Sequence, residues 1–361
     1  MKNEINSGYR YIFGPVPSRR LGVSLGVDLL PAKICTLDCI YCECGKTKTL
    51  ITDRKEYVPA GKVESEIRDY LSGNPDLDYI TFSGSGEPTL HSCMGELINF
   101  LKYDYPNYRV ALLTNGTLLR EPAVLKQVLD ADLVKVSLDA GSVESFVRIN
   151  RPHNALELST ITDGLINFRN IYSKELWVEV FLVKGVNDHD TELKEIKKLL
   201  ELIRPDRIHV NTLDRPGTES WVEAVEKSVM ENIAGYLGGA RLIDGQNSTG
   251  GTFSGDMIEP KQRAHSQPKA QPIIMAGGLA AGLASGLKTD TIPCGRRLLA
   301  ACGGELQLIT ATVKRRPCTA GDVSRILNIT DYEAKKYLDI LSERGEIGKR
   351  IMPRGVFYFR M

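Results

Sequence analysis

Short apolar runs alternate with longer amphipathic stretches between residues 26 and 211 of this 361-residue chain. The apolar runs are rich in β-branched residues, and the stretches between them repeat apolar residues at helical spacing. Strands separated by helices in this way are typical of a parallel sheet covered by helices, so we expect an α/β fold with a partial (β/α)6 barrel. The predicted strands are residues 27–30, 79–83, 110–114, 133–138, 177–183 and 207–211, and the predicted helices are residues 62–72, 95–103, 123–129, 156–170, 191–203 and 223–237.

The pattern changes twice after this barrel, which we place at residues 1–238 with an N-terminal extension. Residues 239–304 are rich in Gly, Ser and Ala and contain no Trp or Tyr, which favours a flexible linker or an insertion. Residues 305–361 regain periodicity, as three short helices and a hairpin that turns at residues 353–355. Thr330 and Glu333 have the spacing of a capping box before the third helix. These elements resemble a small winged-helix domain.

Charge and composition restrict the partners of the chain. The 46 basic and 45 acidic side chains leave no chain-wide field for a nucleic acid or a membrane. Residues 305–361 carry 11 basic against 7 acidic side chains, an excess of four that permits a nucleic-acid or a protein contact. We see no secretory signal and no membrane-spanning stretch, so we expect a cytoplasmic protein whose eight cysteines are reduced.

Three of those cysteines form a compact motif after the first predicted strand. Cys35, Cys39 and Cys42 have the spacing Cys-x3-Cys-x2-Cys. Thiolates bind zinc, copper(I) and iron–sulfur clusters, but a closed zinc site takes four ligands, usually as two separated pairs. Three cysteines in eight residues favour a 4Fe–4S cluster with one iron left open, and structural zinc or incidental thiols are the alternatives. Cys44 is too close to Cys42 to ligate the same small cluster easily, so we expect it to lie beside the site.

Small and polar residues follow the next predicted strands. Residues 84–88 read Gly-Ser-Gly-Glu-Pro, in which the glycines allow close backbone approach and the Glu87 carboxylate is able to hold an ammonium group. Polar side chains at the ends of later strands are expected to face the mouth of the sheet, where parallel β/α folds bind their ligands. An arginine pair, Arg19 and Arg20, lies upstream of the cysteines and either faces an anion in that mouth or is exposed to solvent.

The cysteine spacing, with Tyr41 before the third cysteine, resembles the radical S-adenosylmethionine (SAM) superfamily. The resemblance implies that a 4Fe–4S cluster on Cys35, Cys39 and Cys42 cleaves SAM reductively, and that the 5′-deoxyadenosyl radical so formed abstracts hydrogen from a substrate. It also implies a flavodoxin- or ferredoxin-type electron donor. The residues that it suggests for SAM binding are Gly84, Ser85, Gly86, Glu87, Thr114, Asn115, Ser137, Asp139, Arg151 and Asn211. We name no catalytic residue.

The arginine pair, the cysteine loop and the Gly-x-Gly-Glu-Pro turn together resemble most the branch related to the wyosine-base synthases. That resemblance implies a transfer-RNA base as substrate, and a peptide or a small metabolite is equally compatible with the sequence. Cys294, Cys302 and Cys318 are expected to be scattered thiols, with an auxiliary cluster as the alternative. The alternative function is an iron–sulfur redox sensor that binds DNA through its C-terminal winged helix.

Overall fold

An eight-stranded sheet forms the centre of the computed structural model, which describes residues 9–31, 33–243, 305–327 and 329–361. The strand order is β1-β2-β5-β6-β7-β8-β9-β10. Neighbouring strands from β2 to β10 pair in parallel, whereas β1 pairs antiparallel with β2. The strands are β1 (Ile12–Ser18), β2 (Gly22–Val27), β5 (Tyr79–Phe82), β6 (Arg109–Thr114), β7 (Leu133–Ser137), β8 (Glu175–Leu182), β9 (Arg207–Thr212) and β10 (Arg241–Ile243). Two short strands, β3 (Ile34–Cys35) and β4 (Thr49–Leu50), pair outside this sheet.

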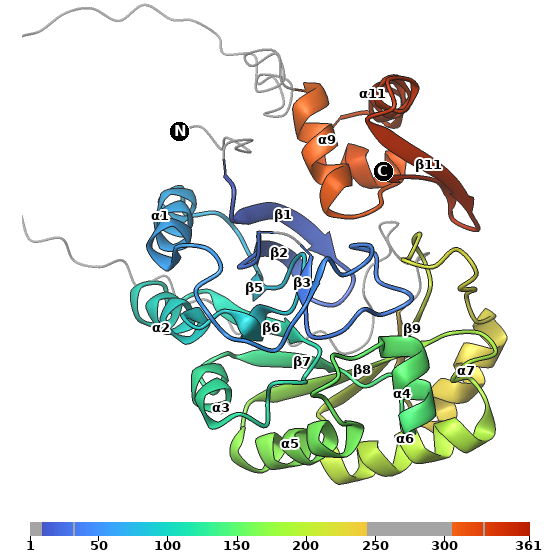
Figure 1. Ribbon diagram of the computed structural model, residues 1–361. Helices are drawn as coiled ribbons and strands as arrows, with labels where there is room; N and C mark the ends of the chain where they lie inside the picture. The colour runs from blue at the N-terminus through green and yellow to red at the C-terminus, as the bar shows by residue number, and fades with distance from the viewer. Residues whose placement is uncertain (1–8, 32, 244–304, 328) are drawn as a thin grey trace, which may run out of the picture.

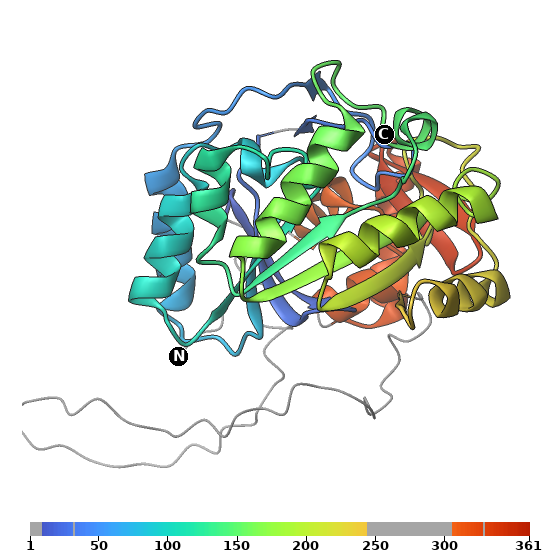
Figure 2. The same ribbon diagram turned by 90° about the horizontal axis from the view of Figure 1, so that it is seen from below.

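Helices cover the outer face of the sheet. Figures 1 and 2 show α3, α5 and α6 along one side of it and the C-terminal elements on the other side. Side chains such as Ile80, Val134 and Val178 face the helices and form a continuous apolar core with them. The helices are α1 (Ala60–Leu71), α2 (Met94–Asp104), α3 (Pro122–Val128), α4 (Val143–Asn150), α5 (Leu158–Ile171), α6 (Asp190–Ile203) and α7 (Lys227–Tyr236), with the short η1 (Pro88–Leu90) before α2.

The opposite face of the sheet curls inward and carries buried polar side chains beside a small apolar cluster that includes Leu133 and Trp177. Lys135 of β7 contacts Glu179 of β8, and both side chains are buried. Arg20, in the turn between β1 and β2 at one end of the strand order, forms an ion pair with Glu179 near the other end. A flat sheet would hold these strands far apart, so the contact shows that the sheet curls into a half-barrel.

The parallel α/β architecture predicted from the sequence is confirmed, with corrections at both ends. The first predicted strand, residues 27–30, is wrong, because β2 ends at Val27 and pairs with the unpredicted β1. The glycines in this hairpin interrupt the apolar pattern by which a strand is recognised in the sequence. One of them is required by the fold, because a Cβ on Gly26 would lie 2.2 Å from the Phe13 ring that packs against it. Helix α4 was not predicted either, and β10 extends the sheet beyond residue 238.

Residues 305–361 form the three helices and the hairpin expected from their periodicity. These are α9 (Glu305–Arg315), α10 (Ala320–Leu327), α11 (Asp331–Glu343), β11 (Ile347–Met352) and β12 (Gly355–Arg360). The Thr330–Glu333 capping box is present, and the elements enclose an apolar core of their own that contains Val313 and Leu338. Cys318 is buried in this core. Most of the expected linker, with Cys294 and Cys302, lies outside the described residues.

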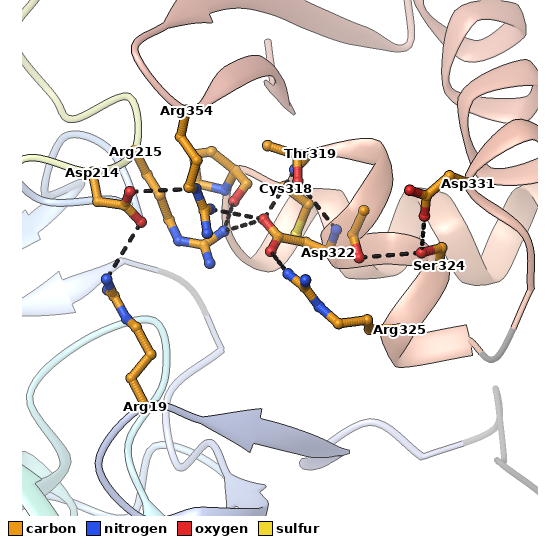
Figure 3. A network of polar contacts seen from close by, with 12 residues as sticks. Arg19, Asp214, Arg215, Cys318, Thr319, Asp322, Ser324, Arg325, Asp331 and Arg354 are labelled. Atoms are coloured by element: carbon orange, nitrogen blue, oxygen red, sulfur yellow. Dashed lines mark hydrogen bonds and ion pairs between the residues drawn. The ribbon is translucent and has the colours of Figure 1, made fainter. Parts of the chain in front are cut away.

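The C-terminal elements are docked against the half-barrel through a network of charges (Figure 3). Asp322 of α10 accepts hydrogen bonds from Arg215, which follows β9, and from Arg354 of the β11–β12 turn. Arg354 also lies 3.3 Å from Asp214, which forms a second ion pair with Arg19. No helix within the described ranges is long and apolar enough to cross a membrane.

Candidate functional site

The cysteine loop crosses the mouth of the half-barrel between β3 and β4. Cys35 lies in β3, and Cys39 and Cys42 follow in a segment whose backbone is fixed by helix α4. The amide of Ile40 donates to the Ile149 carbonyl at 2.9 Å, and the amide of Asp38 donates to the Asn150 carbonyl at 2.9 Å. The end of α4 therefore holds the loop in place.

Each of the three motif cysteines accepts a hydrogen bond from a different nitrogen. Asn115 Nδ2 lies 3.6 Å from Cys35 Sγ, Asn150 Nδ2 lies 3.4 Å from Cys39 Sγ, and Lys33 Nζ lies 2.9 Å from Cys42 Sγ. Donors around thiolate sulfurs stabilise their negative charge and tune a bound iron–sulfur cluster. This donor set fits a cluster held by three thiolates.

The cysteines do not converge on a single ion. No three His, Cys, Asp or Glu side chains gather around an ion-sized point in the part of the chain that the structure describes. A 4Fe–4S cluster places each ligand sulfur on a separate iron, so its ligands surround a larger volume.

Cys44 has different partners from the other three. Its Sγ lies 3.6 Å from the Gly84 carbonyl and 3.9 Å from the Arg315 carbonyl, which places it as a thiol donor between the glycine turn and α9. A hydrogen bond between the two side chains raises the pKa of Cys44 and lowers the pKa of Cys42, whose thiolate also faces Lys33. The sulfurs of Cys35, Cys39 and Cys42 therefore accept hydrogen bonds from nitrogens, whereas the Cys44 thiol donates to carbonyl oxygens.

The Gly84–Ser85–Gly86–Glu87 turn lies directly against the start of the cysteine loop. A Cβ on Gly86 would lie 1.8 Å from the Ile34 carbonyl oxygen, so only glycine fits this approach. The Glu87 amide donates to the same carbonyl at 3.2 Å. Ser85 donates through its amide and its hydroxyl to Asp28 of the loop after β2. The turn is therefore fixed on both sides.

The Glu87 carboxylate is buried and already surrounded by donors. It accepts hydrogen bonds from the backbone and hydroxyl of Thr89, from the Thr114 hydroxyl at 2.6 Å and from the Asn115 amide at 2.7 Å. Burial raises its pKa, although these bonds oppose the shift. In the structure Glu87 therefore joins the glycine turn to the end of β6, while its predicted contact with an ammonium group stays a prediction.

Asp139 has a similar supporting role at the end of β7. Its carboxylate accepts hydrogen bonds from Tyr41 of the cysteine loop, from Asn150 Nδ2 and from the Phe181 amide. Burial raises its pKa. Because Asn150 in turn donates to Cys39, Asp139 positions two residues beside the cysteines.

The remaining predicted residues lie around the same mouth with fewer contacts to it. Ser137 ends β7 on the face that carries Lys135, and Asn211 is buried in β9, where its Oδ1 accepts from the Thr212 amide at 3.0 Å. Arg151 is the C-cap of α4 and forms an ion pair with Glu219 instead of facing the sheet interior.

Two residues beside the cysteines were missed from the sequence. Lys33 gave no motif signal, and Asn150 belongs to α4, a helix that the sequence did not predict. A polar residue that contacts a sulfur 111 positions away is recognisable only once the two segments are folded together.

Known proteins resemble the part of the chain that builds this site. The family model of the radical SAM superfamily matches residues 29–200. A UPF0026 protein of Helicobacter pylori is 39% identical over 209 residues, which cover 57% of this chain and 67% of that protein. A UPF0026 protein of Methanocaldococcus jannaschii is 32% identical, with 61% of this chain and 69% of that protein covered. The chain belongs to the radical SAM superfamily.

The cofactors of this superfamily are a 4Fe–4S cluster and SAM. A protein of Brachyspira hyodysenteriae named GTPase Obg is 39% identical over 63% of this chain, which spans only 33% of that protein. Among solved structures, a radical SAM methyltransferase from Sphaerobacter thermophilus has a TM-score of 0.47 and 17% identity, with 61% of this chain and 65% of that chain covered. The branch and the substrate of this radical SAM protein are not identified by these likenesses.

Proposed function

We propose that this radical SAM protein is an enzyme that binds its 4Fe–4S cluster through Cys35, Cys39 and Cys42. The observation that carries the proposal is the direction of the hydrogen bonds, because these three sulfurs each accept from a nitrogen while Cys44 donates to carbonyls. When bound, the cluster and SAM supply the reductive cleavage of SAM and the abstraction of a hydrogen atom from a substrate.

The chain's own residues contribute position and shielding. Asp139, through Tyr41 and Asn150, holds the loop against β7 and β8, and the Tyr41 ring stacks on Phe181 at 3.8 Å. This stack closes the interior below the cysteines with apolar rings, and a reactive radical is protected where water is excluded. We place the methionine part of SAM beside the turn formed by Gly84, Ser85, Gly86 and Glu87, because this turn lies against the loop.

The other strand-end residues complete the proposed SAM site. Thr114 and Asn115 donate hydrogen bonds to Glu87 and so lie beside the glycine turn. Ser137 lies at the end of β7, and Asn211 lies in β9. Arg151 is the least supported member, since its guanidinium is paired with Glu219. The expected partners are an electron donor of flavodoxin or ferredoxin type and a substrate.

The C-terminal elements are proposed to form a winged-helix-like module, on the support of three helices followed by a two-stranded hairpin. We propose three parts of the chain: a barrel at residues 1–238, to which β10 is added, a linker or insertion at residues 239–304, and the winged-helix-like module at residues 305–361. A transfer-RNA base as substrate and a cytoplasmic location stay predictions.

The decisive experiment measures the cluster and SAM cleavage separately. The Cys35→Ser, Cys39→Ser and Cys42→Ser variants are expected to lose the iron of the reconstituted chain. Cys44→Ser and the control Cys93→Ser, at the N-cap of α2, are expected to retain it. The wild type is expected to show an EPR signal of the reduced cluster that changes when SAM is added, and to produce 5′-deoxyadenosine. Iron loss in Cys44→Ser together with an EPR signal insensitive to SAM would contradict the three-ligand site.

A further inference from the structure

A cluster of incompletely paired charges lies inside the half-barrel, away from the cysteines. Six buried side-chain atoms in the described ranges have no hydrogen-bond partner, although folded proteins pair nearly all such atoms. They are Arg19 Nη1, Arg20 Nε, Glu179 Oε2, His209 Nδ1, Asp214 Oδ2 and Arg354 Nε. We call these six residues the buried charge cluster.

The six residues are connected in space although they come from distant segments. Arg20 forms an ion pair with Glu179, whose register partner in β9 is His209. Asp214, just after β9, lies 3.5 Å from Arg19 Nη1 and 3.3 Å from Arg354 Nε, in contacts without hydrogen-bond geometry. Figure 3 shows Arg19 reaching toward Asp214 from one side and Arg354 from the other.

The cluster has more positive than negative charge. Arg19, Arg20 and Arg354 contact Glu179, Asp214 and Asp322, and the buried ammonium of Lys135 donates to Glu179. Arg215 pairs with Asp322 and with Glu43 beside them. These five positive charges against four negative ones leave an excess of one positive charge. Burial, with Arg20 and Lys135 nearby, lowers the pKa of His209 to about 4, so its ring stays neutral at physiological pH.

The unpaired atoms favour an acceptor as their ligand. Guanidinium nitrogens only donate hydrogen bonds, and three of the six atoms are of this kind. An anionic oxygen group accepts from such nitrogens with good geometry, because the guanidinium fork matches carboxylate and phosphate oxygens. Glu179 Oε2 and Asp214 Oδ2 are acceptors that already face the Arg20 and Arg19 guanidiniums, so they hold these donors in place for the ligand.

The position of the cluster connects it with the cysteine loop. Phe181, two residues after Glu179 on the same face of β8, stacks on Tyr41 of that loop. A ligand group at Glu179 is therefore one layer of side chains below the loop, inside the half-barrel. Arg354 belongs to the turn between β11 and β12, so the C-terminal elements form one side of the buried charge cluster.

We propose that the buried charge cluster binds an anionic oxygen group, a carboxylate or a phosphate, of the substrate, and that Arg354 of the C-terminal elements completes this site. The inference rests on the proposed function in calling the ligand the substrate. It also means that the C-terminal elements contribute a binding residue, Arg354, to a site inside the half-barrel.

The test is equilibrium dialysis of the full cluster-loaded chain against radiolabelled inorganic phosphate, in parallel with labelled acetate, at an ionic strength held constant with NaCl. The wild type is expected to bind one anion per chain saturably, and the better-bound probe identifies the group. Arg19→Gln and Arg354→Gln are each expected to weaken binding about tenfold or more, since a charged hydrogen bond is lost. Arg325→Gln is the matched control, because Arg325 pairs with Asp322 on the exposed side of α10 and is expected to leave binding unchanged.

Saturable binding of neither probe to the wild type would overturn the proposal, and so would equal affinity of the wild type and Arg354→Gln. Thermal unfolding of each variant shows whether it is folded, and Arg19→Lys provides a second variant that retains the charge and is expected to recover part of the affinity. The measurement contains no SAM. Failure of the proposed function would appear instead as absence of 5′-deoxyadenosine from the reconstituted wild type.

Discussion

Replacing Asp322 by Asn tests how firmly the C-terminal elements are docked on the half-barrel. The carboxylate accepts hydrogen bonds from Arg215 Nη1 at 3.1 Å, Arg354 Nη2 at 2.9 Å and Arg325 Nη2 at 2.8 Å. Of these, Arg215 belongs to the half-barrel and is itself buried. The substitution keeps the size of the side chain but removes the buried counter-charge of the Arg215 guanidinium, which retains only its contact with the more exposed Glu43.

The magnitude follows from the pKa of Asp322. Burial alone would raise this pKa, but Arg215 and its neighbours outweigh burial and lower it from 3.8 to about 2. The difference, at about 1.36 kcal/mol for each pH unit, corresponds to about 2 kcal/mol of folding free energy at neutral pH. Because the pKa is lower in the folded state, this stabilisation is present above about pH 4 and is lost as the pH falls toward 2.

Hydrogen-exchange mass spectrometry and denaturant unfolding measure the effect. Asp322→Asn is expected to lower the unfolding free energy by about 2 kcal/mol and to speed exchange in α10 and at the loop after β9. Glu343→Gln, which removes the same charge from an exposed site on α11, is expected to change neither. Identical exchange in Asp322→Asn and Glu343→Gln would refute the electrostatic docking derived from this network.

Three further predictions concern the interior and the cysteine loop. Because burial lowers the pKa of His209 from 6.5 to about 4, the unfolding free energy should fall by up to about 3 kcal/mol as the pH is lowered between these values. In His209→Gln, denaturant unfolding should show a smaller fall over the same pH range. An equal fall in both proteins would contradict the assignment to His209. Asn150→Ala, which removes the donor to Cys39, should make the cluster potential more negative by about 40 mV in a redox titration, and an unchanged potential would exclude that bond from the loaded protein. Gly86→Ala should cost at least about 2 kcal/mol and reduce the iron content, because its Cβ would overlap the Ile34 carbonyl; wild-type iron content would show that the loop moves to accept it.

Local patterns in the sequence account for what was predicted correctly. Strands β5 to β9 are rich in apolar and β-branched residues, a pattern that is visible without any partner even where polar residues interrupt β7, β8 and β9. The Thr330–Glu333 capping box is a contact between residues three positions apart. The spacing of Cys35, Cys39 and Cys42 is also local, so it indicates a three-thiolate loop before the chain is folded.

Contacts between distant segments account for what was missed. Nothing near Asn150 signals that it faces Cys39, and nothing near Arg19 signals that it meets Asp214 after β9. From the sequence, the arginine pair faces either an anion in the mouth or solvent. The structure places both side chains half-buried against acidic residues of the curled sheet.

The sequence by itself determines the parallel α/β architecture, the thiolate motif and the elements of the C-terminal part, because periodicity, capping and spacing act within a few residues. Only the tertiary structure decides which donors surround the sulfurs, that Glu87 and Asp139 support the loop through their neighbours, and that Arg354 reaches the half-barrel. Those outcomes depend on how far the sheet curls and on which surfaces it brings within a few ångströms of one another.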